Sequence, residues 1–304
     1  MTPTVVAGRP RFEGANIRTW IGFKHFMYLV EEAVLQWLRD HGHPPGQLFH
    51  RHGLGVEIVD CSVQLPAVLD IDDEVDAQVD RGRGDRLDVT LRVRRDGRDV
   101  TVARASVRLA LVRERTAEES TPVAPDLAPW VVDDLGGAAD APGSRPYDPR
   151  RPVRDQLVDP DSPALYWPWR ARYFYCHYSD RVQHSAYVRC VEAAVDRLLE
   201  ARGISVGRLL AERAWIPVVS RARVRIHQAA HMEETVHTVV DVDSVLREQL
   251  FEVRLTCHVV RDDRLLTVAE GRVLHGYAIS RGDRAGEVAR LGPDIVATLT
   301  GSAR

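Results

Sequence analysis

The densest group of polar side chains in the sequence is one short segment, residues 177–185, which reads His-Tyr-Ser-Asp-Arg-Val-Gln-His-Ser. Apolar residues with helical spacing follow it directly, so the segment is predicted to be a loop that enters a helix. A carboxylate or an imidazole in such a loop can take a proton from water. The free amides at a helix N-terminus can hold a developing oxyanion. Together these two capacities fit the hydrolysis of an activated acyl group.

Three residues of this segment are the candidate catalytic groups, namely His177, Asp180 and His184. Either Asp180 or His177 could act as the base toward water, and the sequence leaves that choice open. His184 stands just before the predicted helix, where it would assist the base or orient the substrate. Each residue also has a purely structural interpretation. His177 could be a histidine at the end of a strand, Asp180 an exposed carboxylate in a loop, and His184 a polar cap of the helix.

The sequence around this segment occurs twice. Residues 26–80 align with residues 187–241 without a gap, at an offset of 161, and 12 of the 55 positions are identical. The identities include Val30/Val191, Glu31/Glu192 and Gly42/Gly203. This similarity indicates a tandem duplication in which each copy is the size of a domain.

Each copy is predicted to contain an extended segment, one helix and four strands. Apolar residues at spacings of three and four predict the helices, and valine-rich alternation predicts the strands. Gly42 and Gly203 stand where a helix commonly ends. The predicted ranges are 10–20, 25–41, 55–67, 73–81, 86–95 and 98–112 in the first copy, and 166–178, 186–202, 216–228, 232–242, 249–260 and 264–279 in the second.

This pattern divides the chain into two domains, residues 1–113 and 166–280. Residues 114–165 are rich in Pro, Gly, Asp and Ala, which is typical of a linker. We expect the tail, residues 281–304, to be poorly ordered.

The second copy resembles the 4-hydroxybenzoyl-CoA thioesterase family. Its stretch DRVQHSAYVRCVEAAVDRLLEARGI is similar to the family pattern GHVNHAxYLRYFEEARxxxLxxxGI, and VQLPAVLDIDDEVDAQV of the first copy resembles the family's approach to its third strand. Two copies in one chain resemble the double-hotdog thioesterases and dehydratases. The resemblance implies an α+β tandem hotdog fold, in which each long central helix is wrapped by a five-stranded antiparallel sheet. The two units would pack as an intramolecular pseudo-dimer.

The resemblance also places the substrate in the crevice between the two units. The family's catalytic Asp lies ten residues before the tyrosine that Tyr187 matches, and that position here is His177. Asp180 stands where the family usually has glycine. The first copy has Asn16 at the position of His177. The candidate substrate-binding residues are Ser185, Tyr187, Asn16, His25 and Glu32.

The sequence therefore predicts an acyl-thioester hydrolase that acts on acyl-CoA or acyl-carrier-protein substrates, without a cofactor or a metal ion. A hotdog dehydratase or isomerase of β-hydroxyacyl thioesters is one alternative, although the motifs HxxxxGxxxxP and GDxNPxH of two dehydratase groups are both missing. A non-catalytic acyl-thioester-binding protein is another alternative, because neither copy has the family's Asp.

Composition narrows the class of partner. The 41 Lys and Arg residues against 44 Asp and Glu give a net charge of −3, which argues against a dedicated nucleic-acid binder. The first residues lack the pattern of a secretory signal, and no apolar stretch approaches 18 residues, so no membrane partner is expected. The four cysteines form no CxxC pair. We expect a cytoplasmic protein and leave open a homo-oligomer of pseudo-dimers.

Overall fold

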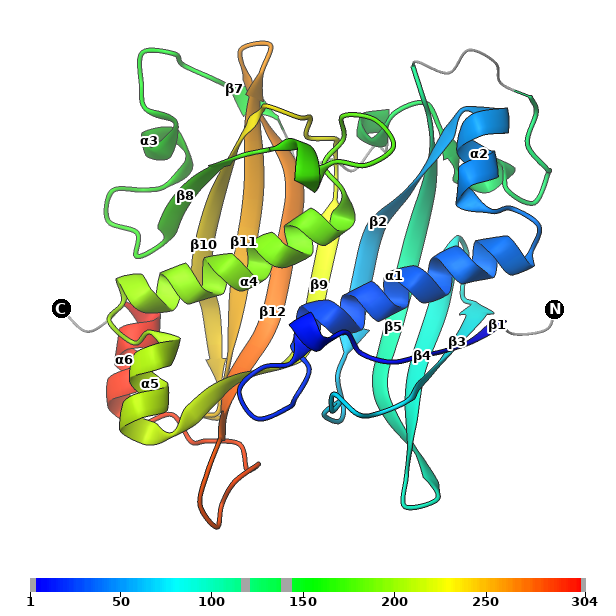
Figure 1. The fold of residues 1–304 in the computed structure, drawn as a ribbon. Helices are drawn as coiled ribbons and strands as arrows, with labels where there is room; N and C mark the ends of the chain where they lie inside the picture. The colour runs from blue at the N-terminus through cyan, green and yellow to red at the C-terminus, as the bar shows by residue number, and fades with distance from the viewer. Residues whose placement is uncertain (1–3, 116–120, 138–143, 302–304) are drawn as a thin grey trace.

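The computed structural model describes residues 4–115, 121–137 and 144–301. Within these ranges the chain forms one sheet of twelve strands, and two long helices lie across one face of it (Figure 1). Along the sheet the strand order is β1-β3-β4-β5-β2-β9-β12-β11-β10-β8, and the short strands β6 and β7 pair with β5 and β12. Five strands of the main path thus come from each half of the chain.

The N-terminal half consists of β1 (Thr4–Gly8), α1 (Phe23–Asp40), α2 (Pro45–His52), β2 (Leu54–Gln64), β3 (Val75–Arg81), β4 (Arg86–Arg95) and β5 (Arg98–Arg113). The C-terminal half consists of β8 (Leu165–Arg170), α4 (His184–Ala201), α5 (Val206–Arg213), β9 (Trp215–Ile226), β10 (Thr235–Leu246), β11 (Leu250–Arg261), β12 (Arg264–Ile279) and α6 (Pro293–Thr300). Between the halves lie β6 (Val131–Val132), β7 (Arg145–Pro146) and α3 (Val153–Leu157).

The second half repeats the first at the offset found in the sequence. The long helices begin at residues 23 and 184, the short helices at 45 and 206, and strands β2 and β9 at 54 and 215, so each difference is 161. The predicted long helices and eight predicted strands agree with these elements. Gly42 and Gly203 follow the two long helices with φ values of 83° and 72°, a left-handed conformation that glycine adopts without strain.

Two expectations about the ends of the chain are wrong. The first strand is β1, which pairs with β3 (Val6 with Ala77), whereas residues 10–20 contain a single 3₁₀ turn and a loop. Pro10 has no N–H to give to a sheet, so the chain leaves the sheet there. The tail contains α6, which packs on β10 because Ile295 and Leu299 bury one apolar face of this helix.

The two halves meet along a line that we call the seam, where β2 pairs with β9 and α1 contacts α4. Ser62 pairs with Arg223, which is its own equivalent in the repeat. A pseudo-two-fold axis therefore passes through this pair. Ion pairs from Lys24 to Glu192 (2.8 Å) and from His184 to Glu31 (2.7 Å) show that α1 and α4 run antiparallel with their first halves side by side.

One buried carboxylate joins the two half-sheets beside this axis. Asp60 on β2 is 3% exposed and accepts hydrogen bonds from Arg223 of β9 (2.6 and 2.8 Å) and from Arg86 of β4. Burial alone would raise the pKa of Asp60, but the bonds from Arg223 and Arg86 lower it overall. The carboxylate is therefore held in its charged form by one arginine from each half.

We predict that Asp60→Asn lowers the free energy of unfolding by about 1–3 kcal/mol at pH 7, because it leaves two arginines without their charged partner. A carboxyl whose pKa is lowered on folding stabilises the protein above its unfolded pKa and loses that effect as the pH falls. The difference between the two proteins should thus shrink below about pH 4. Urea denaturation across pH measures this. Asp76→Asn, an exposed position on β3, is the control, and an equal loss in both variants would contradict the assignment.

Candidate active site

The polar loop identified in the sequence lies at the seam, and backbone hydrogen bonds hold the residues just before α4 in place. Val182 donates its N–H to Ala230 O (2.8 Å) and Gln183 donates to Tyr175 O (2.9 Å). Tyr178 turns the chain with a positive φ of 57°, and its ring lies 5.6 Å from that of Phe49 on α2 of the other half. The loop of the second half therefore projects over the first half.

His177 in this loop is bound to a carboxylate of the other half. Its Nε2 lies 2.9 Å from Oε2 of Glu57 on β2. Arg181 donates from Nε to the second oxygen of Glu57 (2.9 Å) and binds Glu114, which follows β5, with Nη1 (3.1 Å) and Nη2. We call His177, Glu57, Arg181 and Glu114 the cross-seam network, because each half of the chain contributes two of its members.

The network is buried except at the histidine. The Glu57 side chain is 1% exposed, that of Glu114 is 2% and that of Arg181 is 8%, whereas 32% of His177 reaches the surface. Burial opposes the charge on Arg181, but the two glutamates raise the pKa of its guanidinium overall. Two carboxylates share one guanidinium, which leaves excess negative charge next to the accessible imidazole.

Gly55 makes room for this network. A Cβ on that residue would lie 2.2 Å from Oε1 of Glu114 and 2.5 Å from Nη2 of Arg181. No side chain fits there without displacing a buried ion pair, so strand β2 needs glycine two residues before Glu57.

His184 is the first residue of α4, and a second carboxylate of the other half holds it. Its Nδ1 lies 2.7 Å from Oε1 of Glu31 on α1, and its buried Nε2 has no partner in the described part of the chain. The first backbone bond of α4 runs from Ala186 N–H to Gln183 O (3.0 Å). The amides of His184 and Ser185 precede that bond, so they have no acceptor within the helix.

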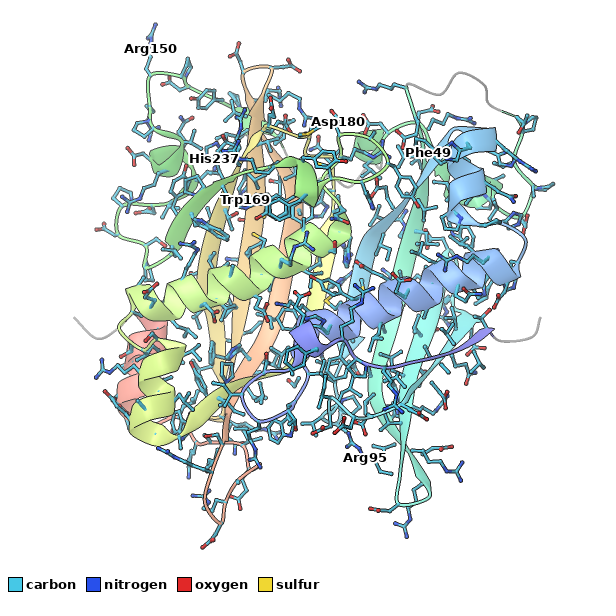
Figure 2. All side chains as sticks on the ribbon, in the orientation of Figure 1. Phe49, Arg95, Arg150, Trp169, Asp180 and His237 are labelled. Carbon is cyan, nitrogen blue, oxygen red and sulfur yellow. The ribbon has the colours of Figure 1, made fainter. Side chains whose placement is uncertain are left out.

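Asp180 lies outside the cross-seam network. Its side chain is 55% exposed and its nearest ionic partner is Nδ1 of His231 at 3.2 Å. Figure 2 shows it at the upper end of the seam. Asp180, Ser179 and Glu114 line a pocket of about 370 Å³ that opens there.

The structure separates the five residues predicted to bind substrate. Ser185 and His25 lie near each other at the seam, since Ser185 contacts Arg189, Arg189 contacts Tyr28, and the Tyr28 ring packs on His25. The other three lie elsewhere: Tyr187 is fully buried in the core, Glu32 is exposed on α1 and Asn16 is exposed in the loop before α1.

The positions related to the network by pseudo-symmetry carry other residues. At the offset of 161, the equivalents of His177, Glu57, Arg181 and Glu114 are Asn16, Val218, Trp20 and His275. His275 is 4% exposed, and burial lowers its pKa to about 4. A neutral imidazole therefore stands at the position equivalent to the carboxylate of Glu114.

Sequence reasoning missed three members of the network, Glu57, Arg181 and Glu114. One signal was available: Glu57 lies between Val56 and Ile58 in the first five residues of β2, which are all buried and otherwise carry no polar side chain. A charged residue in such a strand needs a buried partner. The identity of that partner depends on how the two halves dock.

Comparison with known proteins gives matches among solved structures alone. No family model matches the chain. No curated protein matches it either.

Three solved structures cover nearly the whole chain. A protein of Lactobacillus plantarum described as an oleoyl thioesterase is 13% identical, with a TM-score of 0.58 over 90% of this chain and 96% of its own. The 12:0-ACP thioesterase from Umbellularia californica is 12% identical, with a TM-score of 0.57 over 90% and 94%. An acyl-ACP thioesterase from Bacteroides thetaiotaomicron is 10% identical, with a TM-score of 0.54 over 90% and 97%.

The chain is a double hotdog. The predicted fold class is confirmed, with α1 and α4 each packed against its half of one continuous antiparallel sheet. Because the three structures are only 10–13% identical to this chain, their similarity supports the fold and not a particular activity. In the described part of the double hotdog, no helix combines the length and hydropathy needed to cross a membrane.

We predict that Gly55→Ala destabilises the double hotdog by about 1–3 kcal/mol, because the new methyl group overpacks the Arg181–Glu114 pair. Gly207→Ala on α5 is the matched control: a Cβ there meets nothing within 4 Å, and alanine favours a helix. Urea denaturation of both variants measures the effect. Equal stability of the two variants would contradict the packing of the network.

Proposed function

We propose that this protein hydrolyses acyl thioesters carried on coenzyme A or on an acyl carrier protein. The observation that carries the proposal is the bond between His177 and buried Glu57 at the loop that leads into α4. An imidazole held by a carboxylate, in the loop that runs into helix amides without an acceptor in the helix, suits the attack of water on a carbonyl. Two of the similar structures are acyl-ACP thioesterases by name, which supports the substrate class.

The network determines which nitrogen of His177 is basic. A carboxylate can only accept hydrogen bonds, so Nε2 of His177 donates to Glu57 and the lone pair stays on Nδ1. Nδ1 takes a proton from water while the water oxygen bonds to the thioester carbon. The buried charge of Glu57 stabilises the imidazolium that forms, and Arg181 keeps Glu57 in place.

The N-terminus of α4 would stabilise the intermediate. As water adds, the carbonyl π electrons move to oxygen, and the amides of His184 and Ser185 donate to that oxyanion. When the oxyanion reforms the carbonyl, the carbon–sulfur bond breaks and the thiolate takes the proton held by His177. The products are a free acid and a thiol, so water is the only co-reactant.

His184 orients the reactants in this scheme. Its bond to Glu31 places a proton on Nδ1 and leaves a lone pair on Nε2. That lone pair can accept the second hydrogen of the attacking water. Asp180 is exposed and bound to His231, so it is the weaker candidate for the base.

His177→Gln and Asp180→Asn distinguish the two candidate bases. We expect His177→Gln to lower kcat about 10²- to 10⁴-fold, the usual contribution of a general base. Asp180→Asn should retain kcat within about threefold, because it leaves the network intact. The steady-state release of thiol measures both. The opposite ranking would assign the base to Asp180.

Mass spectrometry tests the reaction itself. The purified protein is incubated with saturated, aryl and β-hydroxyacyl thioesters of pantetheine and of an acyl carrier protein. We expect free acid and free thiol from at least one series. Loss of water with the thioester intact would indicate a dehydratase instead, and an unchanged panel would indicate an acyl-binding protein without activity.

A further inference from the structure

Arg189 lies one turn after Ser185 on the side of α4 that faces α1. Its Nη1 is 3.5 Å from the hydroxyl of Tyr28 and 3.5 Å from that of Ser185. Its Nε and Nη2 are buried and have no hydrogen-bond partner in the described part of the chain. The guanidinium lies over the Tyr175 ring, 5.6 Å from its centroid, and its Nε–Nη2 edge makes no hydrogen bond with the described residues.

Two carboxylates on the same helices are bound to other side chains. Glu192, one turn further along α4, pairs with Lys24 at 2.8 Å, and Glu31 on α1 pairs with His184 at 2.7 Å. Among the described residues no carboxylate forms an ion pair with Arg189. Arg189 as a whole is half-buried, but its Nε and Nη2 are shielded from water without a hydrogen bond, which is costly. An anion on this edge would supply the missing hydrogen bonds.

The surroundings of Arg189 favour an anion as well. The first halves of α1 and α4 lie side by side there, and the positive end of each helix dipole is at its N-terminus. His25, in the first turn of α1, packs on the Tyr28 ring and has a buried Nε2 without a partner in the described residues. Burial and the nearby charge of Lys24 lower the pKa of His25, so it offers a donor without adding a charge.

We propose that Arg189, Tyr28, Ser185 and His25 form a binding site for an oxyanion of the substrate, which we call the Arg189 site. The Nε and Nη2 hydrogens point in parallel and match two oxygens of a carboxylate or a phosphate. The anion is a carboxylate at the far end of the acyl chain. Arg189 lies one helical turn from the amides that would hold the thioester oxygen, whereas the long pantetheine arm keeps its phosphate much further from that oxygen. This identity rests on the proposed function, whereas binding of the anion does not.

Anion binding is measured first, without any turnover. Glutarate and inorganic phosphate are titrated separately at constant ionic strength, and the melting temperature of the full-length protein is recorded. We expect at least one of them to raise Tm by about 2 °C or more near saturation, and Arg189→Gln to abolish the rise. Arg197→Gln is the matched control, because that residue lies on the same helix, is exposed and packs on Trp167.

Hydrolysis of two pairs of substrates then shows which anion of the substrate binds at the Arg189 site. Glutaryl-pantetheine is compared with pentanoyl-pantetheine, and pentanoyl-pantetheine with its 4′-phosphopantetheine counterpart. A preference of tenfold or more in kcat/KM for glutaryl-pantetheine, lost in Arg189→Gln, assigns the carboxylate of the acyl chain to the site. The same preference for the 4′-phosphopantetheine substrate would contradict that assignment. Arg189→Lys should lose most of the preference although it keeps the charge, because lysine cannot form two parallel bonds.

The proposal is overturned if neither anion shifts Tm in the wild type, or if Arg197→Gln removes the shift as fully as Arg189→Gln does. Failure to fold in Arg189→Gln leaves Arg189→Lys and the wild-type titration as the test. If the protein binds an anion but hydrolyses no thioester, the proposed function is refuted, whereas the Arg189 site is still supported as an anion-binding site.

Discussion

Pairing between β2 and β9 is the constraint on which the rest of the structure depends. Five residue pairs, from Asp60 with Arg225 to Gln64 with Arg221, join two half-sheets into one. Because the pairing centres on Ser62 and its own equivalent Arg223, the same contact brings the N-terminal ends of α1 and α4 together. It also places the loop of one half over strand β2 of the other, where Glu57 lies. The candidate site exists only because the halves dock in this register.

The duplication repeats the same backbone arrangement on both sides of the seam, but the side chains at equivalent positions differ. His177 is bound to Glu57, whereas the equivalent residues in the repeat are Asn16 and Val218. A buried carboxylate is costly unless it is paired, so Glu57 and Arg181 depend on each other. Loss of either side chain would leave the other as a buried charge without its partner. This asymmetry is the reason why the proposed hydrolysis uses one site per chain.

Local patterns predicted much of the fold. The spacing of apolar residues gave both long helices, and the alternation of valines gave eight strands, because each element buries one face in its own half. The order of elements and the quoted family motifs gave the double hotdog. The loop with His177, Asp180 and His184 stood out because its polar groups are neighbours in sequence. The contact between His177 and Glu57 spans 120 residues and could not be found, since no local pattern encodes the docking of two domains.

A double-mutant cycle on His177 and Glu57 tests the central claim most directly. The value of kcat/KM for thioester hydrolysis is measured for the wild type, for His177→Gln, for Glu57→Gln and for the double variant. If Glu57 acts through His177, the double variant will be no slower than His177→Gln alone. Losses that multiply, so that the double variant is slower by the product of the two single effects, would contradict a catalytic network across the seam.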